Sequence, residues 1–109
     1  MKFKHNLVYN NAQEVESMFI KGDYNLSRIV VDVTLENLKT KKKVIPIASI
    51  YAEDEDIIFD LALDREDIEE TLTQNLPIME RFEDYERCQK IVDGIKSIKN
   101  KTEKIKMKK

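Results

Sequence analysis

Apolar side chains recur at every second position in three stretches of the chain, and this pattern predicts three β-strands. The clearest stretch is residues 27–36, where four apolar side chains alternate with others that are polar except for Val30: Ile29, Val31, Val33 and Leu35. Such alternation is typical of a strand with one buried face. Two more strands are predicted over residues 43–51 and 56–63. Because the connections are too short for crossovers, we expect an antiparallel meander.

Pro46 conflicts with this simple arrangement. It lies inside the second predicted strand, which a meander places in the centre of the sheet, and proline has no amide hydrogen to donate to a neighbouring strand. Either a β-bulge lies at Pro46 or the strand order differs. Residues 3–9 are a candidate edge strand, since four side chains there share one face: Phe3, His5, Leu7 and Tyr9. The sheet is therefore expected to have three strands, or four with residues 3–9.

Residues 12–21 carry the signals of a helix. Asn11 and Glu14 have the spacing of an N-cap residue and its partner in the first turn. Gly22 is a typical stop signal. Three apolar side chains share one helical face: Val15, Met18 and Phe19.

The C-terminal half predicts two further helices. Asp64 is expected to cap the first of them, with Asp67 at the capping-box position, and Pro77 suits the first turn of the second. An apolar stripe at helical spacing then follows: Ile78, Phe82, Tyr85, Cys88, Val92 and Ile95. The predicted fold class is α+β, with helices on a small antiparallel sheet in the order α-β-β-β-α-α.

A chain of 109 residues has room for one domain. We predict a single compact domain over residues 1–98 and a basic, frayed or disordered tail over residues 99–109. The apolar stripe is longer than is needed to cover a small sheet. Its distal part must then pack on the N-terminal segment, on the first helix or on a second copy, so we expect a monomer or a weak homodimer.

The net charge of −2 conceals three regions of different sign. Residues 1–50 hold eight basic and five acidic side chains, residues 51–87 hold three basic and fourteen acidic ones, and residues 88–109 hold eight basic and two acidic ones. A strongly acidic middle therefore separates a mildly basic first half from a basic end.

Several functional classes lack the residues that they need. One histidine, His5, and one cysteine, Cys88, supply too few ligands for zinc and no supported pair for nucleophilic catalysis. Both glycines are isolated, so there is no phosphate-binding loop, and no cofactor is predicted. The longest uncharged run, Val44 to Ala52, is too short to span a bilayer. With no secretory signal and no disulfide framework, the sequence predicts a soluble cytoplasmic protein.

The acidic residues between 53 and 64 raise the question of a divalent metal. Asp54 and Asp56 alternate as ligands do in an EF-hand loop, but Ile58 occupies the next ligand position and the central glycine is missing. Nothing specifies carboxylates that converge from separate elements, as a two-metal enzyme requires. We assign no metal ligand, and a divalent-metal-dependent enzyme is the weakest of three hypotheses.

The second hypothesis is a nucleic-acid-binding accessory module. Its contacts would be the C-terminal lysines and a predicted loop that contains Lys39, Lys41, Lys42 and Lys43. A solvated charged loop is the competing interpretation. A double-stranded RNA module shares the predicted order of elements, but its second helix presents a basic N-terminus to phosphate. Here residues 64–70 are mostly acidic, which disfavours that module.

The leading hypothesis is a non-enzymatic interaction protein whose acidic face docks on a basic groove of a nucleic-acid-handling partner. Its carboxylates are expected to converge from the loop 53–56 and the helices of residues 64–87. The assigned residues are Glu53, Asp54, Glu55, Asp56, Glu66, Asp67, Glu69, Glu70, Glu80, Glu83, Asp84 and Glu86. A solvated acidic surface that only keeps the protein soluble is the competing interpretation.

The predicted order of elements, combined with an acidic face, resembles the small phage-encoded inhibitors of Cas9 that occupy a nucleic-acid groove as DNA mimics. The resemblance covers coarse topology and charge. It implies an inhibitor encoded by a virus or mobile element and directed against a defence system, and it transfers no individual residue.

Overall fold

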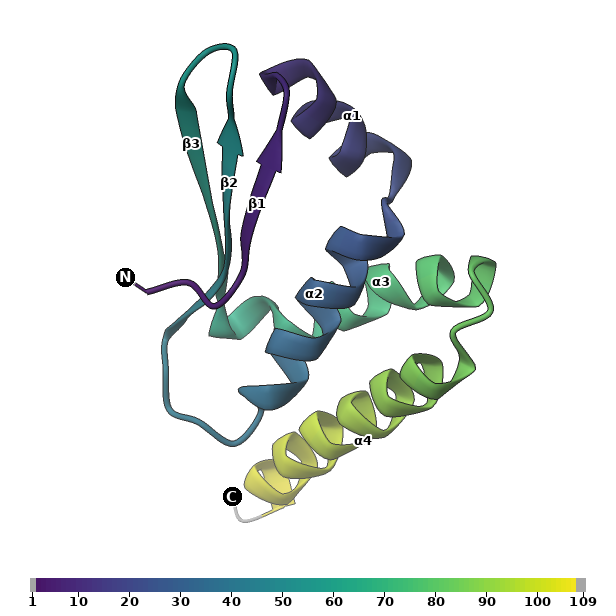
Figure 1. Ribbon diagram of the computed structural model, residues 1–109. Helices are drawn as coiled ribbons and strands as arrows, with labels where there is room; N and C mark the ends of the chain where they lie inside the picture. The colour runs from purple at the N-terminus through teal and green to yellow at the C-terminus, as the bar shows by residue number, and fades with distance from the viewer. Residues whose placement is uncertain (1, 108–109) are drawn as a thin grey trace.

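A computed structural model describes residues 2–107 of the chain, and the side chains of residues 2–100 (Figure 1). The elements in chain order are β1 (Asn6–Tyr9), α1 (Ala12–Lys21), α2 (Tyr24–Glu36), β2 (Val44–Ala52), β3 (Ile57–Asp64), the short 3-10 helix η1 (Arg65–Asp67), α3 (Ile68–Arg81) and α4 (Tyr85–Met107). The strands form one sheet in the order β1-β2-β3, in which β1 is parallel to β2 and β2 is antiparallel to β3.

The α+β class is confirmed, but the predicted antiparallel sheet and order of elements are wrong. The sheet is mixed, and the order is β-α-α-β-β-α-α. The topology on which the resemblance to phage-encoded Cas9 inhibitors depended is therefore not the topology of this chain.

The largest error concerns residues 27–36, which belong to helix α2 and not to a strand. Leu26, Ile29 and Val33 are buried at the three- and four-residue spacing of a helix, and so are Val31 and Thr34 on another side. The helix is enclosed by β2, α3 and α4, so apolar side chains surround most of its circumference. When a helix is apolar on several sides, its apolar residues do not fall on one face, so the sequence does not show the helical period. Alternating β-branched residues in such a helix then resemble a β-strand.

Both of the alternatives predicted for Pro46, a β-bulge and a different strand order, are present. The pairing of β2 with β3 shifts register between Pro46 and Ala48, which is the predicted bulge. Residues 6–9 also form an edge strand, and this strand pairs only with Ser49–Ala52 of β2. On that side of Pro46 no described strand requires an amide donor, so the proline costs the sheet little.

The boundary between the last two helices was predicted at the wrong residue. Pro77 lies inside α3, which continues to Arg81. Losing a helical hydrogen bond at proline costs about 3 kcal/mol, but Leu72 and Met79 on either side of it are fully buried and offset that cost. The chain turns instead at Glu83, whose φ of 57° is left-handed.

Asp64 was predicted to cap a helix, and this prediction is also wrong. Asp64 ends β3 opposite Val44, and neither its carboxylate nor that of Asp67 accepts a capping hydrogen bond. The helix α1 was predicted correctly: the Asn11 side chain accepts from the Glu14 amide, and Gly22 ends the helix with a φ of 67°.

The core lies between the inner face of the sheet and the helices. Five side chains of β2 are buried there: Ile45, Ile47, Ala48, Ile50 and Ala52. In Figure 1, α1 and α2 lie beside β1 and β2, whereas β3 is the strand farthest from α1. The strand β3 is therefore the least covered part of the sheet.

The apolar stripe of the C-terminal half does not cover the sheet. Helix α4 packs on α3 and α2, where Ile91 is fully buried. Phe82 and Tyr85, two predicted members of the stripe, are exposed by 49% and 66%. The predicted frayed tail of residues 99–109 lies partly outside the described residues and stays a prediction, as does the homodimer.

Thr34 generates the first testable prediction. Its side chain is fully buried, and its hydroxyl has no hydrogen-bond partner among the residues whose side chains are described. Thr34→Val replaces the hydroxyl with a methyl of similar shape and removes the desolvation cost, so we expect the free energy of unfolding to rise by about 1 kcal/mol. Urea denaturation measures this change. A loss of stability in Thr34→Val would show that the hydroxyl is satisfied, and Thr73→Val on the exposed side of α3 is the matched control.

Candidate interaction site at the hairpin tip

The twelve predicted carboxylates lie in three separate groups and not on one face. Residues 53–56 form the turn between β2 and β3, at the top of Figure 1, whereas Glu66, Asp67, Glu69 and Glu70 follow the opposite end of β3. A strand of this length separates its ends by about 26 Å. The third group lies at the corner between α3 and α4. The predicted convergence of all twelve is therefore wrong.

Basic side chains accompany the second group, at the start of α3. Glu69 forms an ion pair with Lys99, at 3.8 Å. Glu66 and Glu69 also line an open cleft of about 520 Å³ together with Lys39 and Arg65. Much of the negative charge in this group is thus balanced locally, which weakens it as an attractor for a distant basic partner.

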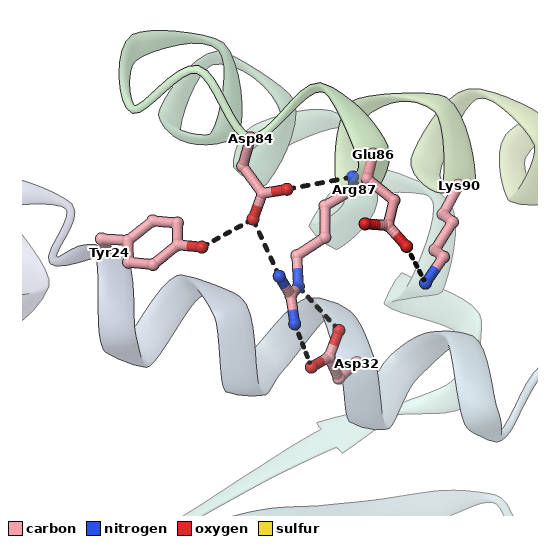
Figure 2. Close-up of polar contacts among 6 residues, drawn as sticks. All are labelled: Tyr24, Asp32, Asp84, Glu86, Arg87 and Lys90. Carbon is pink, nitrogen blue, oxygen red and sulfur yellow. Dashed lines mark hydrogen bonds and ion pairs between the residues drawn. The ribbon is translucent and has the colours of Figure 1, made fainter.

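The third group is occupied by contacts that hold helices together (Figure 2). The Arg87 guanidinium donates two hydrogen bonds to Asp32 of α2, at 2.9 and 2.8 Å, and one to Asp84, at 2.9 Å. The Tyr24 hydroxyl donates to the same Asp84 carboxylate, at 2.7 Å. Only 12% of the Asp84 side chain is exposed. Asp84 therefore joins α4 to α2 and is not available to a partner.

The pKa values in this cluster follow from the same contacts. Desolvation alone would raise the pKa of Asp84, but hydrogen bonds from Tyr24 and Arg87 outweigh it and hold the pKa below its usual value. Hydrogen bonds to Asp32 are the largest cause that raises the pKa of Arg87. The cluster therefore keeps Asp84 ionised and Arg87 protonated at neutral pH.

The remaining carboxylates of the corner are more exposed, and one of them is paired. Glu86 lies 3.5 Å from Lys90, one helical turn away. Glu80 and Glu83 are exposed near the turn. Surface pairs of this kind contribute little to stability, but they reduce the local field.

The first group, by contrast, is a well-anchored turn. The Glu55 carboxylate accepts from the Ala12 amide at the start of α1, at 2.9 Å, and the Asp56 carboxylate accepts from the Tyr51 hydroxyl, at 2.6 Å. The backbone amides of Glu53 and Asp54 donate to the carbonyls of residues 9 and 10. Hydrogen bonds to β1 and α1 thus fix a turn made entirely of acidic residues.

One further carboxylate belongs to this group, and sequence reasoning missed it. Glu14 accepts hydrogen bonds from the amide and the side chain of Asn10, both at 3.2 Å, while the Asn10 carbonyl accepts from the Asp54 amide. We call these five residues the acidic tip: Glu14, Glu53, Asp54, Glu55 and Asp56. Among the residues with described side chains, no ion pair includes any of the five. The spacing between Asn11 and Glu14 predicted the start of a helix but did not indicate that Glu14 belongs to the acidic tip.

The predicted lysine loop lies at the other end of the hairpin and is held by Arg65. The Arg65 guanidinium donates to the Asn37 carbonyl, at 2.7 Å, and to the Thr40 hydroxyl, at 2.8 Å. Lys39, Lys41, Lys42 and Lys43 are all exposed. The loop thus presents four ammonium groups from a backbone that is fastened at both ends.

Neither candidate for nucleophilic chemistry gains support from its surroundings. Burial, and then the carboxylates of Glu80 and Asp84, raise the pKa of the Cys88 thiol. A nucleophilic cysteine needs the opposite shift. The His5 carbonyl accepts from the Ser49 amide, which gives this residue a place at the start of β1.

No protein-family model matches the chain, and no curated protein or solved structure is significantly similar to it. Within residues 2–107, none of the helices has the length and apolar character needed to cross a bilayer.

The Asp84 cluster predicts a dependence of stability on pH. Because the folded pKa of Asp84 is depressed, its contribution is present above the unfolded value of about 3.9 and is lost as the pH falls below it. We expect Asp84→Asn to lower the free energy of unfolding by about 2 kcal/mol at pH 7. This difference should shrink at pH 3. Urea denaturation at both pH values measures it, with Glu80→Gln as the control that should differ little from the wild type. An undiminished difference at pH 3 would contradict the assignment.

A second prediction concerns a cluster outside the tip. Carboxylate oxygens of Asp64, Glu66 and Asp67 lie within 4.8 Å of one another, and all three residues are exposed. Calcium takes six to eight oxygen ligands, whereas these three residues each offer one ligand atom to a common point. We therefore expect no change in Tm when calcium or magnesium is added at millimolar concentration. A rise of several degrees that is lost in Asp64→Asn would overturn this expectation.

Proposed function

We propose that this protein is a non-enzymatic interaction protein whose acidic tip docks on a basic site of a nucleic-acid-handling partner. The observation that carries the proposal is the acidic tip itself. Four of its carboxylates lie on an anchored turn and the fifth, Glu14, lies in α1, and none of them is in an ion pair with any described side chain. Unbalanced charge of one sign steers association with a surface of the opposite sign.

Preorganisation favours the tip over the other predicted carboxylates. Glu55 and Asp56 are already held by hydrogen bonds, so binding a partner costs them little conformational entropy. Glu66, Glu69 and Glu86 have basic neighbours, and Asp84 is mostly covered in the cluster with Arg87. The docking surface that we propose is therefore smaller than the twelve residues that charge alone suggests.

Apolar side chains beside the tip would add contact area to this surface. Ile57 and Ile58 follow the turn directly and are exposed by 42% and 64%. A charged tip next to exposed apolar groups matches the composition of many transient interfaces, in which charge guides approach and apolar contact prolongs the complex. An inhibitor of the DNA-mimic type is one form of this function, in which carboxylates take the place of phosphates.

A second candidate function, direct binding of nucleic acid, is supported by the lysine loop. Four exposed lysines on a backbone fastened by Arg65 would contact phosphates. Each contact would release counterions, so binding would fall steeply as salt is added. The acidic tip at the opposite end of the hairpin would not take part.

Charge reversal at the tip tests the leading proposal. Glu53→Lys with Asp54→Lys changes two carboxylates whose side chains make no hydrogen bond with the described residues, so the fold should persist. Proteins captured by the wild type but not by this double variant are then purified. Their association rate with the wild type should fall at least tenfold in the variant and with added salt, and duplex DNA should compete.

The matched control reverses the same amount of charge elsewhere. Glu69→Lys with Glu70→Lys lies at the start of α3 and should leave capture unchanged. Equal loss in both double variants would indicate a response to net charge alone and would contradict a role for the tip. Binding of the wild type to labelled duplex DNA or RNA, abolished by Lys41→Glu with Lys42→Glu, would instead favour the second candidate.

A further inference from the structure

The outer edge of β3 is not protected against the addition of a further strand. β3 pairs with β2 on one side only, and within the described residues no backbone group of another element bonds to its other side. Its sequence, IIFDLALD, contains neither lysine nor proline, the residues with which proteins often protect a free edge. The bulge of the hairpin lies in β2 and not in β3. The edge can therefore accept another strand.

The pairing of β2 identifies which backbone groups of β3 point to this edge. The Ser49 amide donates to the His5 carbonyl beside β1, so the backbone of Ile50, the next residue of β2, faces β3. Phe59 is the partner of Ile50 and therefore faces β2. Because successive residues of a strand direct their amide and carbonyl groups to opposite sides, the free edge carries those of Ile58, Asp60 and Ala62.

The inner face of this edge is apolar and incompletely covered. Ile57, Phe59 and Leu61 share it, and the first two remain 42% and 38% exposed, because the helices pack mainly on β1 and β2. An open cavity of about 250 Å³ is lined by Leu61, by Phe19 of α1 and by Ile78 of α3. Of the three strands, only β3 lines this cavity. An apolar side chain on the inward face of an added strand would be directed toward it.

The outer face of the edge is acidic. Asp60 lies there beside Ser49, whose hydroxyl donates to it at 3.3 Å, and Asp60 is in no ion pair with a described side chain. Residues 53–60 hold five acidic side chains and no basic one. At the other end of β3 the charges balance, since residues 39–43 and 64–70 together hold five acidic and five basic side chains. The unbalanced charge beside the first half of β3 therefore favours a basic strand there.

Building on the proposed function, we infer that the basic site of the partner includes an extended segment that pairs with β3 as a fourth strand. Its inward side chains are apolar, and its outward side chains beside Asp60 are basic. Hydrogen bonds of the main chain supply affinity in such a complex, and the alternation of side chains supplies specificity. A second β3 strand does not fit this description, because β3 has two acidic residues and no basic one.

A synthetic peptide of alternating valine and lysine, about eight residues long, is the direct probe of the edge. At a peptide concentration of about ten times its Kd, hydrogen exchange of the Ile58, Asp60 and Ala62 amides should slow about tenfold, because these amides are protected only in the complex. Two control peptides replace every valine with serine or every lysine with glutamate, and neither should protect these amides. Equal protection by all three peptides, or none by the valine–lysine peptide, contradicts the inference.

A proline in β3 tests the main-chain contact. Ala62→Pro removes an amide that points outward and leaves both the bonds to β2 and the net charge unchanged, so the fold should persist. Its affinity for the valine–lysine peptide, and for proteins captured through the acidic tip, should fall about tenfold or more. Ala62→Val keeps the amide and is the matched control. Asp60→Lys also keeps every amide and should weaken both complexes through charge, which tests the same edge if the proline variant proves unstable.

The same variants separate this inference from the proposed function. If Glu53→Lys with Asp54→Lys loses the partner while Ala62→Pro and Asp60→Lys retain it, the tip docks without strand addition and the inference is wrong. If Ala62→Pro loses the partner while the tip variant retains it, the edge binds the partner and the role of the tip is wrong. A wild type that forms a dimer by analytical ultracentrifugation, with the dimer lost in Ala62→Pro, would place a second copy on the edge and would also contradict the inference.

Discussion

Enclosure of α2 is the constraint on which the rest of the structure depends. A three-stranded sheet offers one inner face, and α2 lies between that face and the α3–α4 pair, with Ile29, Val31 and Val33 buried. Arg87 completes the enclosure through its paired hydrogen bonds to Asp32, which join α4 to α2 across a partly desolvated contact. Because the helices gather around α2, they cover β1 and β2 and leave β3 largely bare. The uncovered edge is thus a direct result of where the core lies.

The parts of the fold that could be predicted are those specified by local chemistry. Asn11 and Gly22 mark the two ends of α1 through a side-chain cap and a left-handed φ, which neighbouring residues cannot easily override. The strands β2 and β3 alternate clearly, and the missing amide of Pro46 correctly indicated either a bulge or a different strand order. The predictions that failed are those that depend on contacts with residues distant in the sequence. The β-branched residues of α2 alternate like a strand, and only burial by β2, α3 and α4 makes them helical.

The candidate site shows the same division between local and distant information. A count of carboxylates located the acidic turn, because all four residues of the turn are adjacent in sequence. The ion pairs between carboxylates and basic side chains could not be predicted in the same way. Arg87 reaches Asp32 and Lys99 reaches Glu69 across long separations, and these contacts decide which carboxylates keep an unbalanced charge. Glu14 joins the tip only because β1 runs parallel to β2 and brings the start of α1 beside the turn.

That parallel pairing has a consequence for the order in which the molecule assembles. The β2–β3 hairpin joins residues that are close in the chain and can form early, whereas pairing Asn6 with Ser49 requires closure of a long loop that contains α1 and α2. The strand β1 has only four residues, so its hydrogen bonds are the ones most readily opened by local fluctuation. Each opening frees the amides of Glu53 and Asp54 together with the contact between Glu55 and α1. Amide hydrogen exchange in the turn should therefore follow the docking of residues 6–10 on β2 and the turn, and not the global stability of the domain.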